Sequence, residues 1–264
     1  MPRRASVLFG VVLAWAVAAV VAPRAFAAET AWQPLFDGKT LDGWTPKIRG
    51  HAAGIDPYGT FRVEDGLISV GYEGYERFEN HFGHLFYHRP YERYELLVEY
   101  RFVGEQARGG PRWARKNSGV MFHSQSPQSM GIDQDFPISL EAQFLGGFGT
   151  RMRPTLNLCT PGTHVELVTG ELETKHCIAA EAPTVADESW VIVILRVDGH
   201  GRIEHRVNDA TVLAYQHPVV GGGVVSGFDK TVKVDGTPLS GGYIALQSES
   251  HPVHFRRVMI RLLD

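Results

Sequence analysis

Two stretches in the middle of this chain alternate between apolar and polar residues with the two-residue period of a β-strand. Residues 117–123 place an amide, a glycine, a methionine and the imidazole of His123 on one face. Residues 138–145 place Glu141 and Gln143 on one face, with leucine, alanine and phenylalanine on the other. Because successive side chains of a strand point to opposite faces, each stretch predicts a strand that buries one face and offers hydrogen-bonding groups on the other. A sheet of this kind has the layout of a sugar-binding groove.

The rest of the chain predicts further short strands separated by turns, in agreement with its 29 glycines and 15 prolines. Residues 190–197 are a near-continuous apolar run, which predicts a strand buried on both faces. The other predicted strands include residues 94–102, 202–207, 211–215, 243–247 and 254–262, with a hairpin turn at 208–210 and a final strand pair around His251-Pro252. Short strands without a blade-length repeat favour an all-β sandwich or jelly roll over a propeller.

The first 27 residues predict an export signal. Arg3 and Arg4 give a basic start, residues 7–22 are an apolar run, and Ala25-Phe26-Ala27 is a small-x-small cleavage site. A transmembrane anchor is the alternative, since the apolar run nearly reaches the roughly 18 residues that suggest a membrane span. We expect cleavage after Ala27, export to the periplasm or the cell exterior, one domain over residues 28–264, and no stable membrane insertion after cleavage.

The charge of the mature chain argues against a nucleic-acid partner. Cleavage would remove three of the 26 basic residues and none of the 29 acidic ones, which leaves 23 against 29 and a net charge of −6. Binding to nucleic-acid phosphates needs clustered lysine and arginine. We therefore expect a small molecule, rather than DNA or RNA, as the partner.

The chain has two cysteines, Cys159 and Cys177, which are 18 residues apart. Export to an oxidising compartment predicts that they form a disulfide. In the chain-entropy model such a bridge stabilises the fold by roughly 3 kcal/mol. A metal-binding or reactive thiol is the alternative, although two cysteines without a Cys-x-x-Cys pair do not favour a zinc site.

The motif Asn-Ser-Gly-Val-x-x-His at residues 117–123, followed by Glu-x-Gln at residues 141–143, resembles the 3-keto-disaccharide hydrolase domain family. Further matching pieces occur in the same order, so that the resemblance covers nearly all of the chain after residue 30. They are residues 35–44, 61–66, 82–87, 159–164 and 241–256. The resemblance implies an all-β, concanavalin-like jelly-roll sandwich of two curved antiparallel sheets, with the ligand on the concave face.

The resemblance also implies a chemistry. Family members act on glycosides already oxidised to a ketone at C3 of the sugar. The ketone acidifies the proton on C2, so that a base can remove this proton and the enolate can expel the C1 substituent. Addition of water to the resulting enone would give net hydrolysis. We expect Glu141 and His123 to be the base and the acid, because a carboxyl group and an imidazole suit proton transfer.

Other polar and aromatic residues are candidates for binding the oxidised sugar. Trp113 offers a flat apolar face for stacking on a pyranose ring, and amide groups can hold sugar oxygens. The candidate substrate-binding residues are Trp113, Lys116, Asn117, Gln143, Gln247 and Glu249. The long polar loop of residues 125–136 joins the two motif strands, and its Asp133 and Asp135 are candidates for contact with substrate or a cation.

The motifs do not identify a cofactor, although a divalent metal ion could stabilise the enolate. Two histidines near the C-terminal turn, His251 and His254, are candidates for the rim of the groove or for metal ligands. Four others lie in turn-like contexts and are set aside; these are His164, His176, His200 and His217.

Two other functions fit parts of the pattern. An ordinary retaining glycosidase needs two carboxylates about 5.5 Å apart, whereas residues 141–143 offer one carboxylate and an amide. A carbohydrate-binding module without catalysis could use the same face of amides and aromatics. Such a module should tolerate Glu141→Gln with little loss of affinity and should never turn over an oxidised sugar.

Overall fold

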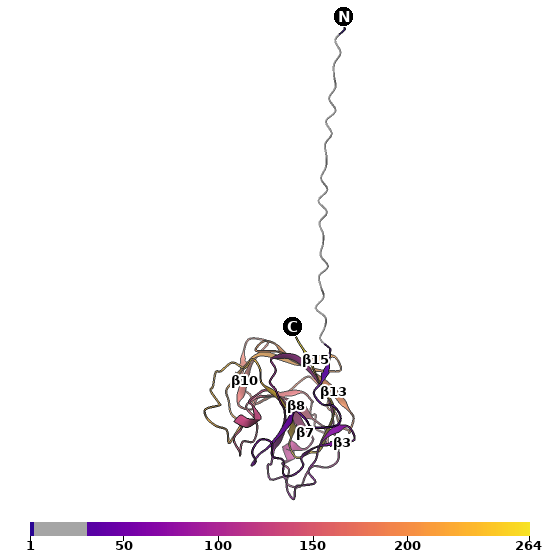
Figure 1. Cartoon of the computed structure of the whole chain (residues 1–264), viewed down its shortest axis with the longest axis vertical. Helices are drawn as coiled ribbons and strands as arrows, with labels where there is room; N and C mark the ends of the chain where they lie inside the picture. The colour runs from indigo at the N-terminus through magenta and orange to yellow at the C-terminus, as the bar shows by residue number, and fades with distance from the viewer. Residues whose placement is uncertain (3–30) are drawn as a thin grey trace.

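Two antiparallel β-sheets pack face to face in the computed structural model of this chain (Figure 1). The structure describes residues 1–2 and 31–264, so the predicted export signal lies outside the described residues except for its first two positions. Across that described part, no helix is long and apolar enough to cross a membrane. Its two short 3-10 helices are η1 (Arg112–Ala114) and η2 (Pro127–Ser129). The prediction of an all-β sandwich with two curved antiparallel sheets is confirmed.

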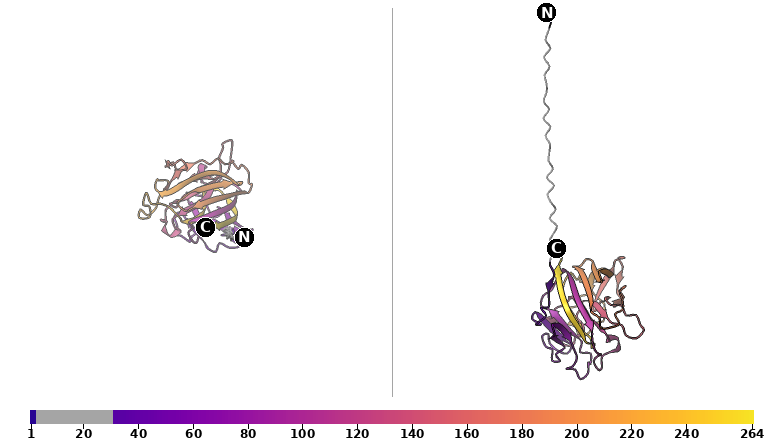
Figure 2. Two further views of the ribbon diagram at one scale, coloured as in Figure 1. Left: turned by 90° about the horizontal axis from the view of Figure 1, so that it is seen from above. Right: turned by 90° about the vertical axis from the view of Figure 1, so that its right-hand side faces the viewer.

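The larger sheet has ten strands. In order across the sheet they are β11 (Leu172–Glu173), β10 (Thr163–Leu167), β15 (Ala210–Val220), β14 (Ile203–Val207), β13 (Val191–Asp198), β6 (Arg93–Phe102), β17 (Val253–Leu262), β4 (Leu67–Val70) and β3 (Phe61–Glu64), with β1 (Gln33–Pro34) paired to the end of β17. The right-hand view of Figure 2 shows this sheet, with the yellow β17 beside the magenta β6.

The smaller sheet has seven strands and carries both sequence motifs. Its order is β12 (Cys177–Ile178), β9 (Asn157–Cys159), β8 (Leu140–Leu145), β7 (Asn117–Ser124), β16 (Tyr243–Ser248), β5 (Gly83–Tyr87) and β2 (Trp44–Ile48). The two motif strands β7 and β8 are therefore neighbours in the sheet.

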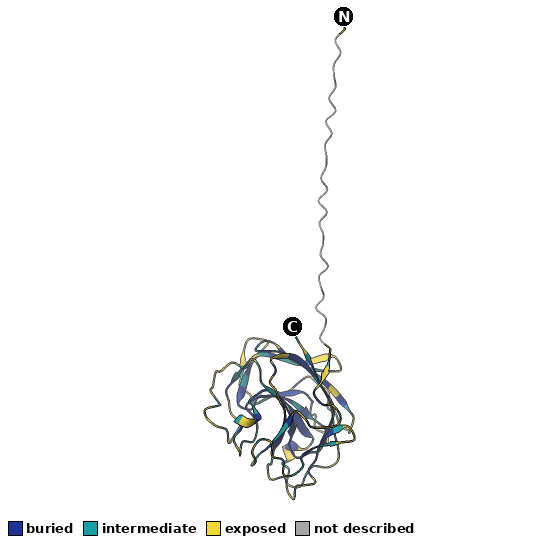
Figure 3. Cartoon of the chain, in the orientation of Figure 1, coloured by how far each residue is buried: buried dark blue, intermediate teal, exposed yellow. Residues whose placement is uncertain are grey.

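The core lies between the apolar faces of the two sheets, and Figure 3 shows buried residues gathered along the strands and exposed ones on the loops. Phe144 of β8 stacks on Tyr100 of β6, with ring centroids 4.1 Å apart and ring planes 5° apart. Such aromatic pairs contribute about 0.5–1.5 kcal/mol beyond the burial of their area. This contact fixes which face of β8 turns inward. It thereby fixes the outer face, on which Glu141 and Gln143 lie.

The predicted hairpin is confirmed, whereas the apolar run at residues 190–197 is less buried than expected. Asn208 and Asp209 join β14 to β15 with φ values of 50° and 62°, the conformation that a two-residue hairpin turn requires. On β13, Ile192 is 40% exposed and Ile194 is half-buried. The prediction of burial on both faces is therefore wrong, because the outer face of the ten-stranded sheet is open to solvent at this strand.

The last two predicted strands both exist, but they do not pair with each other. Strand β16 belongs to the seven-stranded sheet and β17 to the ten-stranded sheet. Residues 249–252 cross from one sheet to the other between them. This crossing places Glu249 and His251 at the edge of the face that carries the motif residues.

Candidate functional site

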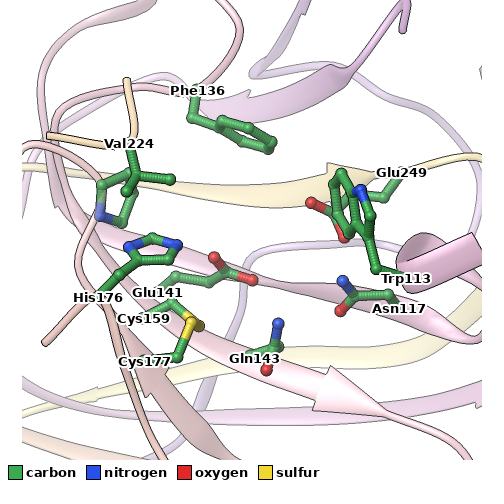
Figure 4. Close-up of a pocket in the computed structure, with 11 residues that line it drawn as sticks. Trp113, Asn117, Phe136, Glu141, Gln143, Cys159, His176, Cys177, Val224 and Glu249 are labelled. Atoms are coloured by element: carbon green, nitrogen blue, oxygen red, sulfur yellow. A yellow bond between two sulfur atoms is a disulfide. The ribbon is translucent and has the colours of Figure 1, made fainter. Parts of the chain in front are cut away.

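A cavity of about 290 Å³ lies over the outer face of the seven-stranded sheet. Side chains of β7, β8 and β9 contribute to its lining, and loops cover it (Figure 4). The lining residues are Trp113, Asn117, Phe136, Glu141, Gln143, Cys159, Pro161, His176, Cys177, Val224 and Glu249.

Glu141 and Gln143 enter this cavity from adjacent positions on the outer face of β8. The strand register places Glu141 between Met121 of β7 and Cys159 of β9. Gln143 lies opposite Gly119 of β7. The structure thus brings these two candidate residues together, on the face opposite Phe144.

Gly119 leaves room for the carboxyl group of Glu141. A methyl group in place of its hydrogen would lie 3.0 Å from Oε1 of Glu141 and 2.9 Å from the carbonyl oxygen of Ala142. Both distances are shorter than ordinary carbon–oxygen contact. The glycine in the Asn-Ser-Gly motif therefore has a steric purpose in this site.

A second carboxyl group, that of Glu249, lies close to Glu141. The side chain of Gln247 lies between them and donates from Nε2 to Oε1 of Glu249 over 3.2 Å. The pKa of Glu141 is raised to about 8 because burial disfavours the carboxylate, and the Gln247 amide opposes this shift only in part. The pKa of Glu249 is also well above its usual range, because of burial and of the neighbouring Glu141 charge, with Arg153 opposing. Both groups are therefore predominantly protonated near neutral pH.

Four buried acceptor atoms around these carboxyl groups have no hydrogen-bond partner among the described residues. They are Asn117 Oδ1, Glu141 Oε1, Gln247 Oε1 and Glu249 Oε2. A buried polar atom without a partner costs about 1–3 kcal/mol. These four atoms lie where a bound molecule with several hydroxyl groups could donate hydrogen bonds to them.

The amide of Gln143 is oriented by a chain of hydrogen bonds. The backbone N–H of Ala180 donates to Oδ1 of Asn157 over 3.0 Å. Nδ2 of Asn157 then donates to Oε1 of Gln143 over 3.1 Å. Because its oxygen is engaged, Gln143 presents its amide N–H groups to the cavity as donors. A carbonyl oxygen of a ligand would be a suitable acceptor.

His176, which the sequence pattern placed in a turn-like context, lies in the wall of the cavity beside Glu141 (Figure 4). Its backbone carbonyl accepts hydrogen bonds from Thr160, over 2.9 Å from the backbone nitrogen and 3.1 Å from Oγ1. Its ring atom Nδ1 is buried and has no partner in the described part of the chain. Burial lowers the pKa of His176 below its ordinary value of 6.5. The imidazole is therefore neutral near neutral pH.

The predicted disulfide between Cys159 and Cys177 is confirmed and forms part of the cavity floor. One ring nitrogen of His176 and the two sulfur atoms all lie within 4.8 Å of one another. Three such ligands could hold a metal ion only if the sulfurs were thiolates. Because both sulfurs are oxidised to the bridge, this cluster does not fit a metal site.

Aromatic rings form the opposite wall and the cover of the cavity. Trp113 is 53% exposed and stacks on Phe82, with centroids 5.8 Å apart. Phe136 lies 4.9 Å from Phe82 and completes the group. In Figure 4 the Glu141 carboxyl group lies between the rings of His176 and Trp113. A flat exposed ring at a cavity mouth suits stacking on the apolar face of a sugar.

Arg153, which the sequence did not single out, fixes the segment that carries Trp113. Its guanidinium donates to the carbonyl oxygens of Trp113 at 3.1 Å, Arg115 at 2.7 Å and Gly146 at 2.6 Å. These bonds tie η1 to the loop after β8. No local motif marks such a residue, because its partners are backbone atoms far away in the sequence.

Asp135 fastens the two loops that cover the cavity. Its carboxylate accepts from the backbone nitrogen of Ser226 at 2.8 Å and from Oγ of Ser226 at 2.6 Å. The backbone N–H of Phe136 also donates to it, over 2.8 Å. Neither Asp135 nor Asp133 is among the described residues that line the cavity. The expectation that Asp135 binds substrate or a cation does not fit this geometry, and the role expected for Asp133 stays a prediction.

His123 does not share the face of Glu141, contrary to the sequence expectation. It has a φ of 47°, and the pairing of β7 with β16 shifts register here, so that two residues of β7 oppose one of β16. Such a β-bulge breaks the alternation of faces. Nε2 of His123 lies 2.9 Å from the carbonyl oxygen of Gly199, in the turn between β13 and β14 of the other sheet. The ring is a buried structural group outside the cavity.

Lys116 also points away from the cavity, because its Nζ donates to the carbonyl oxygen of Ala186 over 3.0 Å. His254 lies on β17 in the other sheet. His251 is buried, with both ring nitrogens unpartnered among the residues described, and its ring lies 5.7 Å from that of Phe102. His251 and His254, which were candidates for the rim of the groove or for metal ligands, thus lie on different elements.

A buried histidine, His84, lies next to Phe136 but does not line the cavity. His84 lies on β5, where it is the cross-strand neighbour of Gln247 on β16 and of Lys47 on β2. Its ring is completely buried, lies 6.0 Å from that of Phe136, and has no partner for either nitrogen within residues 31–264. Burial and the nearby Lys47 charge lower the pKa of His84 to about 3. The sequence piece at residues 82–87 already pointed to this strand, though not to a role for its histidine.

Comparison with known proteins assigns the chain to one family. The model of a family described as the 3-keto-alpha-glucoside-1,2-lyase-like domain matches residues 31–261. No curated protein matches the chain significantly. Two solved structures from Parabacteroides distasonis ATCC 8503, each described as a candidate glycosyl hydrolase, share the fold. The first is 18% identical with a TM-score of 0.51, over 88% of this chain and 94% of the other. The second is 16% identical with a TM-score of 0.52, over 88% of this chain and 100% of the other.

Proposed function

This chain belongs to the 3-keto-alpha-glucoside-1,2-lyase-like family, and from this premise we propose that it is an exported enzyme that cleaves 3-keto-glycosides by elimination across C1 and C2. The substrate is a small glycoside, a glucoside or disaccharide, that a separate oxidation has already converted to a ketone at C3. Water that adds to the enone afterwards turns the elimination into net hydrolysis. The confirmed disulfide fits a protein that works in an oxidising compartment.

One observation carries this proposal: the described residues that line the cavity offer weak acids and donors, with no lysine or arginine among them, and the more distant Arg153 opposes the raised pKa of Glu249 only in part. The pKa of Glu141 lies at about 8 and that of Glu249 is also raised. Displacement at C1 of an ordinary glycoside requires an ionised nucleophile or base beside the acid. Proton removal next to a ketone requires instead a modest base and a donor for the developing oxyanion.

The groups in the cavity can be assigned to the needs of this reaction. Gln143 presents amide N–H groups that can hold the 3-oxo oxygen and stabilise the enolate. Glu141, which is protonated near neutral pH, can give its proton to the leaving oxygen of C1. Trp113 stacks on the apolar face of the sugar, and the unpartnered oxygens of Asn117 and Glu249 accept its hydroxyl groups. An ionisable group in the cavity wall removes the C2 proton.

An ordinary retaining glycosidase is the second candidate, because the structure brings Glu249 close to Glu141. The sequence pattern shows one carboxylate, and the crossing at residues 249–252 supplies the second. Against this function, the two carboxyl groups, one on β8 and one in the crossing after β16, both have raised pKa values. Neither is therefore prepared to act as the ionised nucleophile at neutral pH.

The test is a panel of 3-keto-glucosides beside their unoxidised parents, with aglycone release as the readout and Glu141→Gln as the variant. We expect wild-type cleavage of the oxidised compounds only, and a loss of about 10²-fold or more in the variant. Equal cleavage of the parent glucosides would favour the retaining glycosidase. Tight binding of both kinds of sugar without any turnover would identify a carbohydrate-binding module.

A further inference from the structure

Three sets of contacts hold His176 in the wall of the cavity. Cys177, the next residue, is bridged to Cys159, which is the direct cross-strand neighbour of Glu141. Thr160 donates two hydrogen bonds to the carbonyl oxygen of His176. The ring itself lies against the sulfur atoms. The imidazole is thus fixed beside Glu141 although it belongs to a loop.

The other ionisable groups near the cavity are less suited to remove a proton from a bound sugar. Glu141 and Glu249 lie together on one side, and each has a raised pKa because of burial. His84 lies completely buried beneath Phe136 and does not line the cavity. His123 faces the other sheet. His176 is the group of the cavity wall that combines a fixed position with a ring nitrogen, Nδ1, that has no hydrogen-bond partner among the described residues.

We propose that His176 is the catalytic base that removes the C2 proton of the oxidised sugar, and that the Cys159–Cys177 disulfide holds its imidazole in the cavity. This inference rests on the proposed elimination, and it names the group that removes the C2 proton. It also gives the bridge a purpose beyond stability. In Figure 4 the His176 ring lies beside the Glu141 side chain, with the Cys159–Cys177 bridge drawn below it.

Protons and electrons balance in this arrangement. His176 takes the proton from C2, and the electrons of that C–H bond form the C2–C3 double bond while the 3-oxo oxygen gains a negative charge. When the ketone re-forms, these electrons make the C1–C2 double bond. The C1–O bond breaks, and its oxygen leaves with the bonding electrons and takes the proton of Glu141. The products are an unsaturated 3-keto sugar and an alcohol, and the proton on His176 returns to Glu141 through solvent.

The role of the disulfide follows from the small size of the element that carries it. Strand β12 has two residues and is the edge strand of its sheet, paired only with β9. Without the bridge, two backbone pairs and the two hydrogen bonds from Thr160 to His176 would hold this edge, and short edge pairings open easily. The imidazole would then lose its fixed position, while the core between the sheets would remain intact.

The experiment separates the base from the leaving-group chemistry with a probe that cannot be cleaved, the 3-keto derivative of 1,5-anhydroglucitol. In deuterated water, exchange of its C2 proton needs only a base and a stabilised enolate. Five proteins are compared: wild type, His176→Gln, His176→Ala for rescue by imidazole, Cys159→Ser/Cys177→Ser, and His217→Gln as the control. His217 is an exposed histidine on β15 that pairs with Glu166 at 3.2 Å, away from the cavity. Binding of the probe is followed by tryptophan fluorescence, and folding by thermal melting.

We expect His176→Gln to bind the probe within about threefold of wild type and to lose about 10²-fold or more in the exchange rate. Exogenous imidazole should restore part of the exchange in His176→Ala, because the vacated space can admit it. The double serine variant should remain folded at 25 °C and lose at least tenfold in exchange. The control should match wild type.

Three results would overturn the inference or part of it. If wild type exchanges the probe and cleaves 3-keto-glucosides while His176→Gln does both at the same rate, His176 is not the base and the proposed function still stands. If wild type neither exchanges the probe nor cleaves any 3-keto-glucoside, the proposed function fails and the inference fails with it. If the double serine variant is folded and exchanges as fast as wild type, the disulfide does not position the imidazole.

Discussion

Gly119 of β7 lies so close to Glu141 of β8 that a methyl group on the glycine would come within 3.0 Å of the carboxyl oxygen Oε1. The glycine of the motif and the carboxyl group of the neighbouring strand therefore form one unit. A larger side chain at position 119 should therefore displace the carboxyl group without changing its chemistry.

Gly119→Ala is expected to lower kcat on a 3-keto-glucoside by about tenfold or more, since small displacements of a catalytic group are costly. Stability should fall by about 1–3 kcal/mol, as overpacking typically costs. Steady-state kinetics and urea unfolding measure the two effects. Gly223→Ala is the matched control, because a methyl group there would meet nothing within 4 Å. Equal kinetics for the two variants would show that Gly119 does not position Glu141.

The raised pKa of Glu141 predicts a specific dependence of stability on pH. The folded state binds this proton more tightly than the unfolded state, whose carboxyl group titrates near 4.5. This contribution to stability is therefore complete below pH 4.5 and is lost as the pH rises through about 8. Glu141→Gln removes it, because the amide does not titrate. As the pH rises, the free energy of unfolding of the wild type should therefore fall relative to that of the variant, by on the order of a few kcal/mol.

Urea unfolding of both proteins at pH 5, 7 and 9 measures this difference. A difference that is constant across this range would mean that Glu141 titrates normally in the folded protein.

Arg153 should act on substrate binding through Trp113. Arg153→Ala removes three short hydrogen bonds to backbone carbonyls, and each is worth about 1 kcal/mol or more. We expect KM to rise about tenfold with a smaller effect on kcat, because the stacking surface becomes mobile while the acid and base remain in place. Arg151→Ala, at an exposed position nearby, is the control. A loss confined to kcat would contradict a role in holding Trp113.

The fold could largely be predicted from the sequence, because alternation reports directly on which side chains face a core. The register of Glu141 and Gln143 and the hairpin at Asn208 followed from such local patterns. The face of His123 did not, since one residue in the left-handed region shifts the alternation after it. His176 joins the cavity through a disulfide, a long-range connection that leaves no periodic signal in the sequence. Glu249 was among the predicted binding residues, but its place beside Glu141 depends on a crossing between sheets that local patterns do not report.

The new placement of His123 leads to a prediction that separates structure from catalysis. His123→Gln should lower the free energy of unfolding by about 1–3 kcal/mol, since a buried hydrogen-bonded ring is replaced near Gly199. The kcat per folded molecule should remain within about twofold of wild type, in contrast to His176→Gln. Kinetics at a temperature well below the melting midpoint, with both variants side by side, measure this. A loss of 10²-fold or more in His123→Gln alone would restore the sequence-based assignment.

The most direct test of elimination follows a deuterium label at C2 of a 3-keto-glucoside. Removal of the C2 proton is the step that distinguishes this reaction from displacement at C1. We predict that the sugar product has lost the label, and that the rate with labelled substrate is lower than with unlabelled substrate. Substrate incubated without enzyme for the same time corrects for spontaneous exchange. If the sugar product instead retains all of its deuterium at C2 and the two rates are equal, cleavage does not proceed by elimination and the central claim is wrong.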